Sequence, residues 1–151
     1  MTATAEELIR ATTAVGEHYY ASAAAVGLSV QEARLLFILS ARPSNMLGLT
    51  SALGVPKSTM TGLVARMESA GLVVRARDPA DRRRLITEPT AKGRAAAATF
   101  ARDLATRVSA VLSPLDASEQ SELAVLLGEI LQRAEVEQPK PSLARTGQRH
   151  R

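Results

Sequence analysis

Apolar and polar residues follow the period of a helix through most of the chain. In the segment 56–70, Met60, Leu63, Val64 and Met67 fall at i, i+3, i+4 and i+7. This spacing places four apolar side chains on one face of a helix. The opposite face is small, polar and basic, with Lys57, Ser58, Thr59, Thr61, Gly62, Ala65 and Arg66. The pattern therefore predicts a helix that buries one face and exposes a polar one.

Five further helices are predicted around this segment. They span 6–26, the stretch from Ser29 to Pro43, 47–53, the stretch from Thr90 to 113, and 116–134. Ser29-Val30-Gln31-Glu32 is a capping box, and Gly27 and Gly71 follow predicted helices as C-terminal glycines do. Pro56 suits the first position of the 56–70 helix.

A β-hairpin is predicted between the fourth and fifth helices. Residues 72–77 and 84–88 are short and β-prone, and they bracket the turn sequence Asp78-Pro79-Ala80-Asp81. The tip of this hairpin carries Arg82, Arg83 and Arg84. The fold class is therefore expected to be mainly α with a small β-hairpin.

Positive charge is concentrated in one internal block and at the end of the chain. Residues 54–94 hold nine basic and four acidic side chains, whereas 1–53 and 95–138 are net negative. Such a block suits a polyanion such as nucleic acid, although a solvated Arg-rich surface would give the same count. The segment 139–151 is apolar-poor, with a net charge of +4, and is predicted to be a disordered basic tail.

Several function classes are disfavoured by what the sequence lacks. It has no cysteine, which excludes disulfides, thiolate-bound zinc and a thiol redox switch. Hydrolase, kinase and dinucleotide signatures are absent, so we expect a non-enzyme with no cofactor or metal. No apolar run reaches the roughly 18 residues of a membrane span, and the first ten residues have no basic leader segment. A cytoplasmic location is expected.

Two short helices followed by a hairpin with a basic tip form a winged helix-turn-helix. The 56–70 helix has one face to dock on its own domain and another that is small enough for a major groove. A basic hairpin tip suits the narrow, negative minor groove. The residues predicted to form the DNA-binding site are Lys57, Ser58, Thr59, Thr61, Gly62, Arg66, Arg75, Arg77, Asp81, Arg82, Arg83 and Arg84.

The stretch from Leu47 to Gly93 resembles the MarR family of multiple-antibiotic-resistance regulators. The matching residues are Gly54 to Thr61, Leu63 to Val73, Arg75, Asp78 to Arg83, and Thr90 to Gly93. One departure is Pro89, where the family usually has Leu. A proline cannot donate to a sheet ladder, so the second hairpin strand is expected to end early.

The resemblance implies a single domain over 1–138, with the winged helix-turn-helix at 30–90. It implies a homodimer held by the helices of 1–28 and 91–138, a pseudo-palindromic operator, and repression that is relieved by a small, commonly aromatic ligand. It also makes Arg83 the wing arginine and Asp81 its structural companion.

Three alternatives remain open on the residues alone. His18, Tyr19 and Tyr20 are either the wall of an effector pocket or packing residues. The tail arginines, Arg145, Arg149 and Arg151, either solubilise the chain or add non-specific DNA affinity. The whole domain could instead be a dimerisation or adaptor module of the same fold without specific DNA binding.

Overall fold

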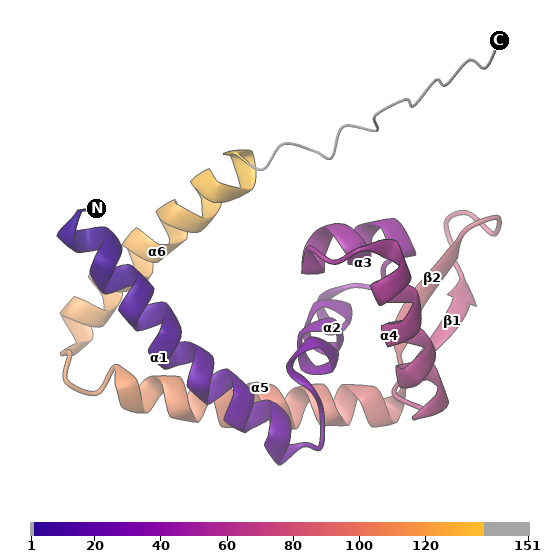
Figure 1. The fold of residues 1–151 in the computed structure, drawn as a ribbon, viewed down its shortest axis with the longest axis horizontal. Helices are drawn as coiled ribbons and strands as arrows, with labels where there is room; N and C mark the ends of the chain where they lie inside the picture. The colour runs from indigo at the N-terminus through magenta and orange to yellow at the C-terminus, as the bar shows by residue number, and fades with distance from the viewer. Residues whose placement is uncertain (1, 138–151) are drawn as a thin grey trace, which may run out of the picture. The chain divides into compact units, whose positions relative to one another are not determined.

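The computed structural model describes residues 2–137, so the predicted tail at 139–151 lies outside the described residues. The elements in chain order are α1 (Ala3–Ala25), α2 (Val30–Ala41), α3 (Met46–Leu53), α4 (Lys57–Ser69), β1 (Val73–Arg77), β2 (Leu85–Pro89), α5 (Ala91–Val111) and α6 (Ala117–Glu137) (Figure 1). The fold is mainly helical with one hairpin, as predicted. The described residues divide into two compact units, one up to Ala110 and one from Val111 onward.

The helix ends follow the local signals in the sequence. Gly27 has a φ of +68°, and Leu28 N–H donates to the Ala23 carbonyl at 3.0 Å, which closes α1. The capping box at the start of α2 is confirmed, because Ser29 Oγ accepts from Glu32 N–H and Glu32 Oε2 accepts from Ser29 N–H. At the start of α6, Asp116 Oδ1 accepts from Glu119 N–H at 2.9 Å.

Among the described residues no single helix is long and apolar enough to cross a membrane. α1 and α2 pass the same test of length and composition only as a pair, which is bent by 86°.

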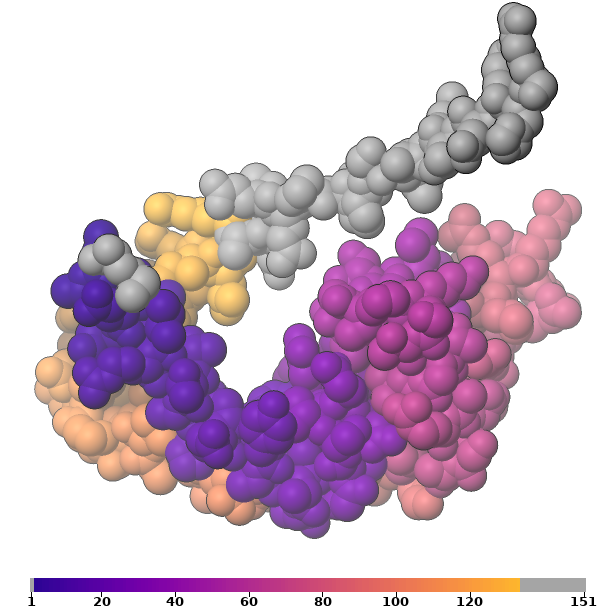
Figure 2. All heavy atoms as spheres, viewed as in Figure 1, coloured from indigo at the N-terminus to yellow at the C-terminus, as the bar shows by residue number. Residues whose placement is uncertain are grey.

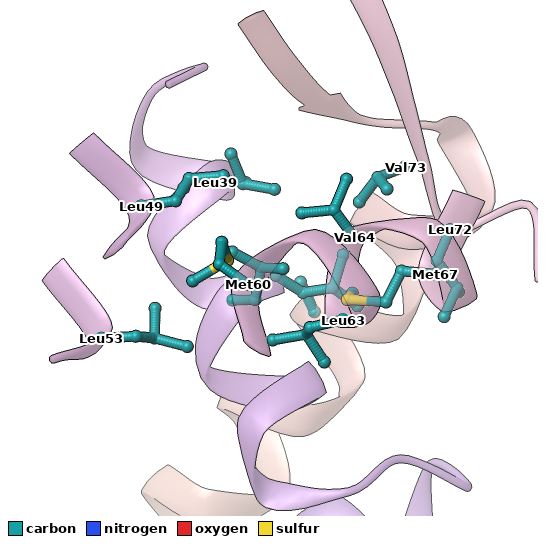
Figure 3. Close-up of a cluster of buried hydrophobic side chains, with 12 residues drawn as sticks. Leu39, Leu49, Leu53, Met60, Leu63, Val64, Met67, Leu72 and Val73 are labelled. Atoms are coloured by element: carbon teal, nitrogen blue, oxygen red, sulfur yellow. The ribbon is translucent and has the colours of Figure 1, made fainter. Parts of the chain in front are cut away.

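The main core lies where α2, α3 and α4 meet. The four apolar residues of the α4 stripe are each no more than 2% exposed, so the predicted core-facing stripe is confirmed. They pack with Leu35, Leu36 and Leu39 of α2 and with Leu49 and Leu53 of α3 (Figure 3). A smaller cluster joins α1, α2 and α5 through Ala23, Ala33 and Phe100.

The hairpin strands pair in antiparallel register from Val73 opposite Pro89 to Arg77 opposite Leu85. The expectation that Pro89 would end the second strand early is wrong. Pro89 is the last residue of β2 and is buried. Both strands of a two-stranded sheet are edge strands, where a proline is tolerated.

The segment between α2 and α3 also joins the hairpin. Ser44 N–H donates to the Thr87 carbonyl at 3.1 Å, and Thr87 N–H donates back to the Ser44 carbonyl at 2.8 Å. This bridge attaches β2 to the loop that leads into α3.

The first turn of α5 docks on the backbone just after α4. Thr90 Oγ1 donates to the Gly71 carbonyl at 2.6 Å and accepts from Gly93 N–H at 3.0 Å. Lys92 Nζ donates to the Ala70 carbonyl at 2.8 Å. A Cβ atom at Gly93 would collide with the Leu72 carbonyl oxygen, so only glycine allows this approach.

We therefore expect Gly93→Ala to lower the free energy of unfolding by about 1–3 kcal/mol, the usual cost of overpacking. Gly62→Ala is the matched control, because a Cβ there meets nothing closer than the Arg66 Nη1 at 3.7 Å. The control should stabilise α4 by about 0.5–1 kcal/mol, since alanine favours a helix over glycine. Urea unfolding at one fixed protein concentration measures both, and equal stabilities for the two variants would contradict the close approach.

Candidate nucleic-acid interface

The face of α4 opposite the core is exposed. Lys57, Ser58, Thr59, Thr61 and Arg66 are all exposed, and Gly62 is half-buried. Because the helix has 3.6 residues per turn, burial of the apolar stripe turns these side chains outward. The structure thus brings the predicted α4 residues together on one surface.

The start of α4 leaves backbone N–H groups free. The helix begins at Lys57 after Pro56, one residue later than predicted, with no side-chain cap. Thr61 Oγ1 donates to the Lys57 carbonyl at 2.8 Å, so this hydroxyl is held against the helix. Uncapped N–H groups beside a lysine can donate hydrogen bonds to an anion such as a phosphate.

The wing consists of β1, β2 and the turn between them, and its tip extends beyond α3 and α4 (Figures 1 and 2). Asp81 organises the turn: its Oδ1 accepts from Arg83 N–H at 3.0 Å, and its Oδ2 lies 3.3 Å from Arg84 Nε. Arg82 and Arg83 are exposed. Asp81 therefore fixes the backbone from which the tip arginines project.

Two other predicted DNA-binding arginines are engaged within the protein. Arg75 Nε lies 3.5 Å from Glu68 Oε2, which ties β1 to α4. Arg77 Nη1 donates to the Arg82 carbonyl at 2.8 Å, across the wing turn. These side chains brace the wing, whereas Lys57, Arg66, Arg82 and Arg83 form no ion pair within residues 2–137.

The three side chains of α1 predicted to contact an effector lie in different environments. Tyr19 packs edge-on against Phe100, with ring centroids 4.9 Å apart. Burial raises the pKa of the Tyr19 hydroxyl above its ordinary value, and the charge of Arg34 offsets part of this effect. His18 is half-buried, and Tyr20 is 64% exposed. Tyr19 thus joins the core, and the three side chains do not share one environment.

Sequence reasoning missed a cavity of about 450 Å³ beside the exposed face of α4. It lies between the start of α3, the start of α4 and the beginning of β2, and its wall includes Lys57, Arg84 and Leu85. Periodicity could not indicate it, because the cavity depends on the Ser44–Thr87 bridge, which brings distant segments together.

Comparison with known proteins gives consistent matches. A model of the MarR family matches residues 26–84. The HTH-type transcriptional repressor YetL of Bacillus subtilis (strain 168) is 29% identical over 125 residues, which are 81% of this chain and 73% of that protein.

Solved structures extend the similarity over most of the chain. One is the transcriptional repressor CouR bound to a 23-mer DNA duplex, with 31% identity and a TM-score of 0.68 over 83% of this chain and 89% of that one. Another is the MarR family protein Rv2887 of Mycobacterium tuberculosis in complex with p-aminosalicylic acid. It has 25% identity and a TM-score of 0.70 over 85% of this chain and 98% of that one.

The two bonds of Asp81 make a testable prediction for the wing. In Asp81→Ala the Arg83 amide loses its acceptor, and its solvent exchange should become roughly two- to tenfold faster. Asp81→Asn retains Oδ1 and should keep the exchange rate while losing the ion pair with Arg84. NMR exchange measurements on the Arg83 amide distinguish the variants. Both should unfold within about 0.5 kcal/mol of the parent, because the turn is on the surface.

Proposed function

The chain belongs to the MarR family, and we propose that it is a ligand-responsive transcriptional repressor that binds a pseudo-palindromic operator as a homodimer. This is a family of transcriptional regulators, which is not an enzyme class. The observation that carries the proposal is the two-sided character of α4, which buries four apolar side chains and exposes a polar, basic surface beside the wing.

In this proposal α4 lies in the major groove. A helix is about 10–12 Å across, close to the roughly 12 Å width of that groove. Thr59 and Arg66 are exposed on the free face of α4. Thr59 can bond to a phosphate or a base edge, and Arg66 can pair bidentately with guanine. Lys57 and the free N–H groups beside it bind phosphate and so fix the register of the helix.

The wing tip lies along the adjacent minor groove. This groove has its most negative potential where A·T-rich sequence narrows it, and it attracts arginine there. Arg82 and Arg83 are exposed and unpaired within residues 2–137, so their guanidinium groups are available. Arg75, Arg77 and Arg84 contribute to the field of the wing and hold its shape.

Homodimerisation is supported by apolar side chains that one chain leaves in solvent. In α6 these are Val125, Leu126, Leu127, Ile130 and Leu131, each 41–64% exposed. A soluble chain rarely leaves so many exposed together, and a two-fold dimer is the commonest way to cover them. A pseudo-palindrome with half-sites about one helical turn of DNA apart, roughly 34 Å, would present one half-site to each α4 helix of such a dimer.

Ligand response is supported by the structure of Rv2887, which was solved with p-aminosalicylic acid. A small aromatic effector would act by stabilising an arrangement of the two α4 helices that does not fit DNA. His18, Tyr19 and Tyr20 stay candidates for contacting it, with the half-buried Tyr19 ring as a wall. A repressor of this kind acts where the DNA is, so we place it in the cytoplasm.

We expect the protein to sediment as a dimer at micromolar concentration. Ile130→Glu should weaken the association at least about tenfold, because it would bury a charge in an apolar interface. Glu122→Gln is the control on the same helix and should leave the association unchanged. Analytical ultracentrifugation measures all three proteins, and a wild-type monomer would remove the basis for a palindromic operator.

The two DNA-reading elements should respond differently to mutation. With a site selected from random duplexes, Arg66→Ala should cost about 1–3 kcal/mol and relax the preference at one position of each half-site. Arg83→Ala should weaken all sites more evenly, with the largest loss where A·T-rich flanks narrow the minor groove. Arg102→Ala, an exposed α5 arginine, is the control for loss of charge. Fluorescence anisotropy over a salt series measures these affinities.

The outcomes also separate the regulator from the alternative adaptor. Binding that weakens steeply with salt supports the regulator, since each neutralised phosphate lowers log K by about 0.9 per unit of log salt. A protein that dimerises but shows no salt-sensitive DNA binding would be an adaptor module. Wild-type affinity of Arg83→Ala on every flank would show that the wing does not contact DNA.

A further inference from the structure

The first turn of α5 is bonded to the backbone that leaves α4, and one of these bonds comes from an exposed lysine. Lys92 Nζ donates to the carbonyl of Ala70, the residue that directly follows α4, at 2.8 Å. Lys92 is exposed and makes no ion pair within residues 2–137. A cation suits this place, because the carboxyl end of a helix carries partial negative charge.

The bonds at the start of α5 differ in kind from the apolar contacts around them. α1, α2 and α5 also meet through the smaller apolar cluster, and apolar contacts are non-directional. A hydrogen bond weakens steeply as its angle departs from linear. The bonds from Lys92 and Thr90 to the carbonyls at 70–72 therefore add a constraint on the angle between α4 and α5.

A small change in that angle has a large effect at the far end of α4. The helix has 13 residues, so it is about 20 Å long. A tilt of about 5° about its last residue would move its first turn by about 1.7 Å, given that length. In a two-fold dimer both helices would tilt, and the distance between their first turns would change by up to about 3.4 Å, the rise of one base pair.

We propose that Lys92 is a positioning residue that restricts the dimer to one spacing of the two operator half-sites. Lys92 does not touch DNA in this role. Its ammonium holds the Ala70 carbonyl, and a duplex with one base pair more or fewer between the half-sites would break that bond as α4 tilts. The inference rests on the proposed function, since a spacing exists only for a dimer that binds two half-sites.

The test uses the full chain and three duplexes: a site selected from random DNA, and the same site with one base pair inserted or deleted between the half-sites. Fluorescence anisotropy gives the ratio of the affinity for the selected spacing to the affinity for each altered spacing. Lys92→Met removes the donor and keeps a side chain of similar length. The ratio should fall about three- to tenfold in this variant, because an altered spacing no longer costs a hydrogen bond.

Two further variants separate positioning from other effects. Lys92→Arg keeps a donor and a charge and should restore the ratio. Arg102→Met removes a charge from an exposed position of the same helix and should leave the ratio unchanged, although all three affinities fall together if charge alone matters. A loss of folded protein would also lower the apparent affinity for all three duplexes without changing their ratio.

The angle can also be followed without DNA, because the chain has no cysteine of its own. Ser51→Cys places one spin label per subunit on an exposed position of α3, and α3 packs with α4 in the main core. Electron spin resonance then gives the distribution of distances between the two labels of a dimer. Lys92→Met should broaden this distribution, and Arg102→Met should not.

An unchanged spacing ratio or an unchanged label distribution in Lys92→Met would overturn the role of Lys92 and leave the proposed function standing. An equal fall of the ratio in Lys92→Arg would overturn it as well, since the bond would then not be the cause. A wild-type dimer that binds all three duplexes equally would overturn a fixed spacing. A monomer, or a protein that binds no duplex, would instead overturn the proposed function and this inference with it.

Discussion

Burial of one face of α4 determines how the rest of the first unit is arranged. Four side chains, Met60, Leu63, Val64 and Met67, are almost fully removed from solvent, and together they set the rotation of the helix about its axis. A shift of the apolar pattern by one residue would turn the helix by about 100°. Arg66 and Thr59 would then face the core. The burial that stabilises the domain therefore also determines which face of α4 is exposed to solvent.

The joint between α4 and α5 transmits this orientation to the long helix. The backbone that leaves α4 has carbonyl groups at 70–72 that need partners, and the residues at the start of α5 supply the donors. Lys92 bonds to Ala70, Thr90 Oγ1 bonds to Gly71, and Thr90 N–H bonds to Leu72 at 3.0 Å. The close contact at Gly93 leaves little free space in the joint. Because packed contacts resist gradual deformation, a displacement of this turn of α5 must move the end of α4 as well.

Features encoded by residues close in the sequence could be predicted. The capping box at Ser29 and the α4 stripe depend on neighbours within one or two turns, and both are present. The sequence also predicted the MarR family and a hairpin around the turn at 78–81. Helix limits were less accurate: α1 begins at Ala3 and not at 6, since fraying ends have weak signals.

Features that depend on distant partners could not be predicted. Ser44 pairs with Thr87 and Gly93 meets Leu72, and no periodic pattern links residues so far apart. The prediction that the second strand would end before Pro89 was wrong. The general rule that proline has no N–H to donate does not say at which strand positions a hydrogen bond from that N–H is needed. The cavity was missed for the same reason, since three elements must first be assembled around it.

The basic residues of 54–94 differ in their bonding, which a count of charges in the sequence does not show. Nine basic residues in 54–94 are equivalent in the sequence, but five of them bond within the protein: Arg75, Arg77, Arg84, Lys92 and Arg94. The other four, Lys57, Arg66, Arg82 and Arg83, lie exposed on α4 and at the wing tip. A guanidinium that already holds a carbonyl or carboxylate must give up that bond to bind a phosphate. The internally bonded cations therefore shape the surface and its field, and the proposed DNA contacts fall to the other four, which form no ion pair within residues 2–137.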